Sequence, residues 1–387
     1  MIDTKILDEQ YISHTYSRFP VEIIEGKGSF MYDVEGKEYI DLGSGIAVNI
    51  FGACDPLWVE AVASQLGKLQ HTSNLYYTQP CTQLAKLLCE KTGAKKVFFG
   101  NSGAEANECA IKIARKYAKE KKGEDTYKII TLKNSFHGRT ITTLAATGQD
   151  VFHNDFLPLT DGFIYAEANN IESVKNLVKS NKVAAIMFEC VLGEGGVLTL
   201  EDDFAKGLYS LAKEEDILLI CDEVQTGNGR CGEMYAYMHY GIQPDIVTTA
   251  KGLGGGLPIG ACMMFDKTEN VLKYGDHGST FGGNPATCAG AISVVSRIDD
   301  KLLAEVKAKS DYIFKSLSGA KGVKSVSGMG LMIGIETEKD ASLVINECMS
   351  NGVLVLKAKT KVRLLPPLNI PMELLERAIE VIKKACE

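Results

Sequence analysis

The sequence has no long apolar run, no basic block and no Cys-x-x-Cys pair, and each absence excludes a class of protein. Its longest apolar runs, such as residues 183–188, are far too short to cross a bilayer. Residues 1–8 lack the basic-then-apolar pattern of a secretory signal. The formal net charge of −7 and the scattered lysines and arginines do not favour nucleic acid as a ligand. We therefore expect a cytoplasmic protein with no membrane and no nucleic-acid partner.

Cysteine and histidine are present, but their spacing does not indicate disulfide bonds or a metal site. Among the eleven cysteines, Cys190, Cys221 and Cys262 stand inside apolar runs, which is typical of reduced, buried thiols. The six histidines are scattered without the spacing of a ligand cluster. We expect no disulfide framework and no bound metal.

A chain of 387 residues is longer than one hydrophobic core usually organises, so two domains are expected. Between residues 55 and 285, short β-branched runs alternate with amphipathic stretches such as 104–121, which predicts an α/β fold with a mostly parallel sheet flanked by helices. Segments 1–54 and 286–387 are expected to form a smaller α/β domain together. The strands expected in the large domain are residues 96–99, 128–132, 183–189, 217–221, 246–249 and 259–265.

Ligands of parallel sheets bind at the carboxyl ends of the strands, and two of these ends suggest how an anion and a ring could be held. The strand 96–99 runs into small residues at 100–104 and then a helix, a pattern that can cradle one phosphate. A helix cap by Asn101 or Ser102 is the structural alternative. After the strand at 128–132, Phe136 could stack on a flat ring, although a single Phe is more often part of the core.

Two further strand ends carry groups suited to covalent chemistry. Asp222 follows an apolar strand and needs a partner to stay ionised, such as a protonated ring nitrogen, a salt bridge or a helix cap. Lys251 leaves another apolar strand before the glycine-rich segment 252–258, so desolvation would favour a nucleophilic amine. A flexible loop with a surface lysine is the alternative. Phosphate cradle, carboxylate, lysine and stacking ring together are what pyridoxal 5'-phosphate requires.

These motifs resemble those of the class III (subgroup II) aminotransferases, which have PLP-dependent transferase fold type I, and most of all those of the acetylornithine aminotransferases. The resemblance runs from residues 16–20 to 363–368 and is most specific at 101–107, 136–140 and 222–227. It implies that Lys251 binds the cofactor and acts as catalytic base, and that Asp222 pairs with the ring nitrogen. The cofactor-binding residues it implies are Ser102, Gly103, Ala104, Phe136, His137, Glu189, Asp222, Glu223, Val224, Gln225, Lys251 and Thr280.

The resemblance also implies a substrate site shared between the two subunits of a homodimer. Arg139 would bind the distal carboxylate of the substrate. Arg363 would bind the α-carboxylate of glutamate or 2-oxoglutarate, with Glu194 covering it when an amine without that carboxylate is bound. Ser279 and Thr280 would reach the neighbouring subunit. Because lysines alternate before Arg363, a solvated strand face is the alternative there.

The activity implied is transfer of the δ-amino group of N2-acetyl-L-ornithine to 2-oxoglutarate, giving N-acetyl-L-glutamate 5-semialdehyde and L-glutamate, in arginine biosynthesis. Ornithine, succinylornithine and 4-aminobutyrate aminotransferases are alternatives within the family. An NAD-dependent dehydrogenase and a non-catalytic cofactor-binding protein are alternatives outside it. Cys190, Leu192 and Ser327 depart from the usual family residues, and Leu192 puts substrate preference in doubt because it lies close to Glu194.

Overall fold

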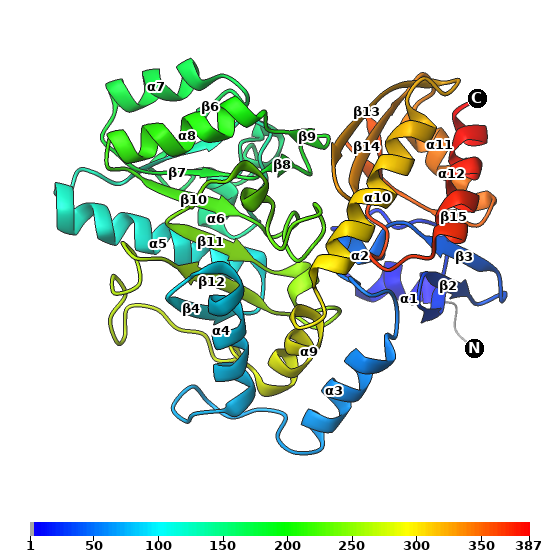
Figure 1. The fold of residues 1–387 in the computed structure, drawn as a ribbon, viewed down its shortest axis with the longest axis horizontal. Helices are drawn as coiled ribbons and strands as arrows, with labels where there is room; N and C mark the ends of the chain where they lie inside the picture. The colour runs from blue at the N-terminus through cyan, green and yellow to red at the C-terminus, as the bar shows by residue number, and fades with distance from the viewer. Residues whose placement is uncertain (1–3) are drawn as a thin grey trace.

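A seven-stranded sheet forms the centre of the computed structural model, which describes residues 4–387 (Figure 1). Residues 1–3, part of the expected segment 1–54, lie outside the described residues. All strands run parallel except β12, which pairs antiparallel with both β4 and β11. In sheet order the strands are β4 (Lys96–Gly100), β12 (Gly260–Met264), β11 (Ile246–Thr249), β10 (Leu218–Asp222), β7 (Val183–Phe188), β5 (Lys128–Leu132) and β6 (Phe163–Ala166). The predicted α/β fold with a mostly parallel sheet is confirmed.

Helices cover the central strands on both faces, which explains why these strands are apolar without alternation. Leu218 and Ile220 of β10 pack in the core formed with α5 (Gly103–Lys122). Leu219 and Cys221 belong to the core on the side of α8 (Asp202–Glu214). The smaller helices of this part are α6 (Ile141–Ala146) and α7 (Ile171–Ser180), and α7 lies beside α8 in Figure 1.

The six expected strands are present, with ends that differ by no more than one residue. The sequence pattern did not predict β6 (Phe163–Ala166). This strand has four residues, stands at the edge of the sheet and is only partly buried. A short edge strand packs on one side only, so its sequence carries a weak pattern.

The two ends of the chain meet in smaller sheets, on the right in Figure 1. Val353 of β15 pairs in parallel with Ile40 of β3, so a C-terminal strand extends the N-terminal meander. The first sheet has the order β1 (Ile23–Lys27), β2 (Phe30–Asp33), β3 (Glu38–Asp41) and β15 (Val353–Leu354). The second has the order β13 (Val323–Met329), β14 (Met332–Thr337), β17 (Lys361–Leu364) and β16 (Leu356–Ala358). The domain boundaries at residues 55 and 285 stay a prediction.

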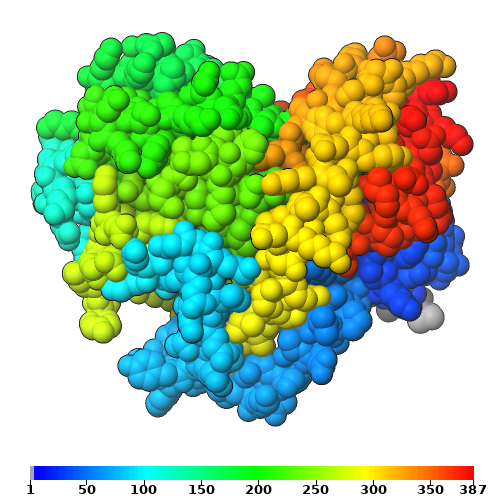
Figure 2. Space-filling model, in the orientation of Figure 1, coloured from blue at the N-terminus to red at the C-terminus, as the bar shows by residue number. Residues whose placement is uncertain are grey.

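The remaining helices pack around these sheets, and α3, α4 and α9 lie together below the central sheet in Figure 1. These helices are α1 (Thr4–Tyr11), α2 (Ser44–Ala47), α3 (Pro56–Leu66), α4 (Gln79–Thr92), α9 (Pro285–Val295), α10 (Asp300–Leu317), α11 (Ala341–Ser350) and α12 (Met372–Cys386). Figure 2 shows a notch in the upper outline between the lobe of α7 and α8 and the lobe of β13 and α10. Within residues 4–387 no helix is long and apolar enough to span a membrane.

Candidate active site

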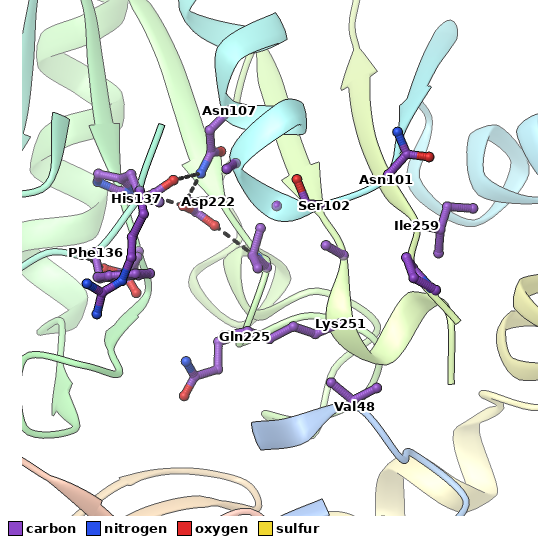
Figure 3. A pocket seen from close by; sticks show the side chains of 18 of the residues that line it. Val48, Asn101, Ser102, Asn107, Phe136, His137, Asp222, Gln225, Lys251 and Ile259 are labelled. Carbon is purple, nitrogen blue, oxygen red and sulfur yellow. Dashed lines mark hydrogen bonds and ion pairs between the residues drawn. The ribbon is translucent and has the colours of Figure 1, made fainter. Parts of the chain in front are cut away.

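A cavity of about 440 Å³ opens at the carboxyl ends of β4, β5, β7, β10 and β11 (Figure 3). Most of the candidate residues that the sequence placed at separate strand ends meet here, as expected for a parallel sheet. The predicted site residues that line the cavity are Ser102, Gly103, Ala104, Phe136, His137, Arg139, Glu189, Asp222, Val224, Gln225 and Lys251. The sequence motifs therefore converge on one space.

The turn between β4 and α5 is closely packed and depends on glycine. A Cβ atom on Gly103 would lie 2.7 and 2.8 Å from the two methyl carbons of Val224. Ser102 caps the helix, since its hydroxyl accepts from the Glu105 amide at 3.2 Å, so the structural alternative for this serine is correct. The first amides of a helix have no partner within it, and Gly103 and Ala104 carry such amides at the wall of the cavity. Cap and anion cradle therefore coexist.

Asp222 stands at the end of β10 and is 3% exposed. Its Oδ2 atom accepts from His137 Nδ1 at 2.7 Å and from Asn107 Nδ2 at 2.8 Å (Figure 3). Its Oδ1 atom accepts from the Val224 amide at 3.0 Å. Three donors from different segments of the chain therefore hold this buried carboxylate. His137 Nε2 is buried and has no hydrogen-bond partner among residues 4–387.

Lys251 follows β11 and adopts a left-handed backbone conformation, with φ of 44°. A non-glycine residue in this region stores strain, which is common at functional sites. Burial lowers the pKa of the Lys251 amine; Glu194 acts in the opposite direction, and Arg363 adds to the lowering. The segment after it is not a loose loop, because a Cβ on Gly252 would lie 2.6 Å from a side-chain carbon of Ile50.

Glu194 and Arg363 form an ion pair beside the cavity. Glu194 lies between β8 (Val191–Leu192) and β9 (Leu198–Thr199), and its Oε1 atom lies 2.6 Å from Arg363 Nη1. Gln225 contacts both partners, accepting from Arg363 at 3.1 Å and donating to Glu194 at 3.3 Å. Burial opposes ionisation of Glu194, but Arg363, together with Lys251 and Gln225, outweighs burial and holds the pKa of this carboxyl below its usual range.

Arg363 is 3% exposed, so the alternative of a solvated strand face does not hold for it. Of the three alternating lysines, only Lys361 shares strand β17 with Arg363, and it is half-buried. Lys359 lies in the turn between β16 and β17, and Lys357 and Lys359 are both exposed. Arg363 is therefore the member of this pattern that is buried, and it lies beside the cavity.

The loop after β5 brings an aromatic ring and a guanidinium to the rim of the cavity. The Arg139 guanidinium carbon lies 5.7 Å from the Phe136 ring centre and 4.6 Å from that of Phe152. The Phe136 amide donates to Glu189 Oε1 at 2.8 Å. Burial and the nearby Asp222 raise the pKa of the Glu189 carboxyl well above its usual value. Arg139 is exposed and can meet an anion that enters from solvent.

Five candidate residues do not line the cavity: Glu194 and Arg363 lie beside it, and Glu223, Ser279 and Thr280 lie elsewhere. Glu223 is fully buried, and its carboxylate accepts from the Thr226 hydroxyl at 2.5 Å and from the Tyr237 amide at 2.7 Å. Ser279 accepts from Asn101 Nδ2 at 3.1 Å, outside the cavity, and Thr280 is exposed. The structure of this chain therefore does not bring Glu223, Ser279 or Thr280 to the site.

Comparison with known proteins identifies the family. The model of the family "Aminotransferase class-III" matches residues 11–386. The chain belongs to the class III aminotransferases. The acetylornithine aminotransferase of Haemophilus ducreyi is 50% identical over 380 residues, which cover 98% of this chain and 97% of that protein. The predicted recognition of this family, and with it an aminotransferase, is confirmed.

Two solved structures share the fold of this aminotransferase. An ornithine aminotransferase from Toxoplasma gondii, described with partial occupancy of PLP at its active site, has a TM-score of 0.94 and 33% identity, covering 99% of this chain and 93% of that one. The N-acetylornithine aminotransferase of Stenotrophomonas maltophilia has a TM-score of 0.85 and 33% identity, covering 98% and 97%. The predicted PLP fold and cofactor agree with these relatives.

Sequence reasoning gave no role to Asn107, although it lies in the motif 101–107. It lines the cavity and donates to Asp222, and its burial on α5 was foreseeable from the helical spacing. The unusual Ser327 of the aminotransferase also has a structural explanation. Its hydroxyl donates to the Val197 carbonyl at 2.8 Å and accepts from Lys361 at 2.8 Å, which joins β13 to the loop that carries Glu194.

Proposed function

We propose that this aminotransferase transfers the δ-amino group of N2-acetyl-L-ornithine to 2-oxoglutarate, using pyridoxal 5'-phosphate. The observation that carries the proposal is one cavity lined by Lys251, Asp222 and the Gly103 turn, beside the Glu194–Arg363 pair. The acetylornithine substrate is supported by the names of the relatives from H. ducreyi and S. maltophilia.

The residues present fit the cofactor. The glycine at position 103 keeps side-chain atoms out of a turn where two helix amides can bind a phosphate. Asp222 has acceptor capacity left on Oδ1 for a protonated ring nitrogen, while Phe136 and Val224 offer apolar surface for the ring. When bound, the cofactor supplies an aldehyde for the amino group and a ring that withdraws electrons from the reacting carbon.

The chain's own residues provide proton transfer. Lys251 Nζ is the amine that would hold the cofactor covalently, and when free it would take a proton from the substrate carbon that bears the amino group. The lowered pKa of Lys251 increases the fraction of neutral amine near neutral pH. Asp222 keeps a negative charge opposite the ring nitrogen.

The Glu194–Arg363 pair gives a physical basis for two substrates in one site. Arg363 is buried, and an unpaired buried guanidinium is costly, so Glu194 covers it while an amine is bound at its δ end. A substrate α-carboxylate then replaces Glu194 on the guanidinium. Arg139, exposed at the rim, is proposed to bind the carboxylate at the other end of the substrate.

A homodimer with shared sites is part of the proposal. Thr280 is exposed in this chain, next to the exposed ring of Phe281. Asn74 ties this loop to the exposed Leu75–Tyr77 segment by donating to Ser279 O at 3.0 Å. Exposed apolar surface of this kind is typical of an interface. Ser279 and Thr280 would then act at the partner's cavity.

The other candidate functions lack comparable support. A dehydrogenase would leave Lys251 and Asp222 without a role, and a non-catalytic binder would not need the Glu194–Arg363 exchange. All eleven cysteines are free, which supports the proposed cytoplasmic setting. The place in arginine biosynthesis stays a prediction from the resemblance.

Steady-state kinetics test the proposal. Glutamate formation from 2-oxoglutarate is measured with N2-acetylornithine, N2-succinylornithine, ornithine and 4-aminobutyrate as separate donors. We expect the highest kcat/KM with N2-acetylornithine, and a loss of at least about 10³-fold in the Lys251→Ala variant. A higher kcat/KM with another donor would contradict N2-acetylornithine as the substrate but not the transamination reaction. If no donor gave glutamate, both the substrate and the reaction would be contradicted.

A further inference from the structure

We propose that Asn107 is a positioning residue that fixes the Asp222 carboxylate so that one acceptor position, on Oδ1, faces the cavity. The inference rests on the proposed function, in which that position receives the ring nitrogen of the cofactor. Asn107 is 1% exposed and comes from α5, whereas Asp222 ends β10. Figure 3 shows the Asn107 side chain reaching down to Asp222 beside His137.

The Asn107 side chain forms hydrogen bonds with three other segments of the chain. Asn107 Nδ2 donates to Asp222 Oδ2 at 2.8 Å and to the carbonyl oxygen of His137 at 2.8 Å. Asn107 Oδ1 accepts from the Thr248 hydroxyl at 2.7 Å. Thr248 pairs with Asp222 across the neighbouring strands β11 and β10. One amide therefore links α5, the loop after β5, β10 and β11.

The orientation of this amide follows from its partners. A carbonyl oxygen and a carboxylate oxygen can only accept, so the nitrogen of Asn107 must face His137 and Asp222. The amide oxygen must then face Thr248, whose hydroxyl can donate. Rotation of the amide by 180° would place its oxygen against two acceptors and leave Thr248 opposite a second donor. The side chain is thus locked in one orientation.

The fixed orientation of the Asn107 amide determines which oxygen of Asp222 can still accept a hydrogen bond. A carboxylate has about four acceptor positions, two on each oxygen. Oδ2 is filled by His137 and Asn107, and Oδ1 already accepts from the Val224 amide. The remaining position lies on Oδ1. Without Asn107, Oδ2 would have a free position, and the carboxylate could rotate about its carbon–carbon bond.

The test compares Asn107→Ala with a matched control, Asn228→Ala. Asn228 is also 1% exposed, and it donates to the hydroxyl of Thr249, the residue next to Thr248 on β11. Both substitutions delete a buried amide bound to a β11 threonine, but only the first removes a donor to Asp222. Thr248→Val is a milder variant that removes only the hydrogen bond to Asn107 Oδ1 and keeps the Asn107 donor to Asp222.

Three quantities are measured on each purified variant: the thermal midpoint of the cofactor-free protein, the Kd for pyridoxal 5'-phosphate, and the pH midpoint of the bound cofactor's visible band. For Asn107→Ala we expect the Kd to rise about 10-fold, as for loss of one hydrogen bond to a charged group. We also expect the pH midpoint to rise, because a less firmly protonated ring withdraws less from the lysine linkage. Thr248→Val should shift both in the same direction by about threefold or less.

Asn228→Ala should lower the thermal midpoint without moving the pH midpoint of the band. An unchanged pH midpoint in both Asn107→Ala and Thr248→Val, with a normal band in the wild-type protein, would overturn the role of Asn107. Equal shifts in Asn228→Ala would also overturn it, since they would mark a general effect of a lost buried amide. If the wild-type protein gives no visible band with the cofactor, the proposed function itself fails.

Discussion

Two acid–base pairs flank the cavity, and they are built differently. The side chains of His137 and Asp222 are 0% and 3% exposed; His137 lies in the loop after β5, and Asp222 ends β10. The side chains of Arg363 and Glu194 are 4% and 30% exposed and come from β17 and the hairpin of β8 and β9. Asp222 accepts from three donors, whereas Glu194 accepts from Arg363 and Gln225.

The difference separates a permanent charge from a replaceable one. A carboxylate surrounded by buried donors cannot leave them without large cost, which suits a group that must stay opposite the cofactor ring. A partly exposed carboxylate on a short hairpin can move into water when a substrate carboxylate takes its place. The first pair is suited to chemistry, and the second to substrate exchange.

The largest expected effect comes from Lys251→Ala, which leaves both pairs in place and removes the base between them. We expect transamination to fall by at least about 10³-fold, as for loss of a positioned general base, while pyridoxal 5'-phosphate still binds non-covalently. Glutamate production and the absorption spectrum are measured on the same preparation. Substantial remaining turnover would remove Lys251 from this role.

Asp222→Ala removes the carboxylate that is proposed to stay opposite the cofactor ring. We expect proton removal from the substrate to slow by about 10²-fold or more, the scale of one preorganised electrostatic contact. Single-turnover kinetics with N2-acetylornithine measure this step. Glu223→Gln is the matched control, because Glu223 is the next acid in the chain but lies outside the cavity. Equal losses in the two variants would indicate a folding defect, and normal kinetics in Asp222→Ala would contradict the role.

Glu194→Gln removes the charge that a substrate carboxylate is proposed to replace, and it leaves the Asp222 carboxylate in place. Arg363 would then be less well covered, so 2-oxoglutarate is expected to bind better and the amine donor less well. We expect the ratio of the two kcat/KM values to change by about 10-fold, which corresponds to one charge-assisted hydrogen bond. The two half-reactions are measured separately. An unchanged ratio would mean that Glu194 does not compete for Arg363.

The smallest effect concerns stability against pH. Because the pKa of Glu194 is lowered in the folded protein, its ionisation stabilises the fold above the usual value of 4.5 and this contribution is lost as the pH falls through the lower folded value. The free energy of unfolding of the wild-type protein should therefore exceed that of Glu194→Gln at pH 6. The gap should narrow on acidification below pH 4.5. A constant gap would contradict the ion pair as its source.

Much of the site could be predicted because its residues follow strands whose apolar sequences mark where they end. Asp222 and Lys251 were identified in this way, and both line the cavity. The parallel topology itself brings strand ends together, so adjacency required no knowledge of side-chain contacts. The roles assigned to these residues stay predictions from the family resemblance.

The remaining contacts could not be read from the chain because they depend on tertiary packing. The bond from Asn107 to Asp222 joins residues 115 positions apart, and the contacts of Gln225 with Arg363 span 138 positions. Glu223 stands beside Asp222 in the sequence but points to Tyr237, since successive strand residues face opposite sides. Alternation along β10 could have separated these two acids.

The central claim is tested most directly by the visible spectrum of the purified protein loaded with pyridoxal 5'-phosphate, recorded as N2-acetylornithine, ornithine and 4-aminobutyrate are added in turn. We predict an absorption band from the cofactor bound to Lys251, bleached far faster by N2-acetylornithine than by the other amines. Absence of this band in a protein supplied with the cofactor would contradict the assignment of Lys251, and with it the account of both pairs.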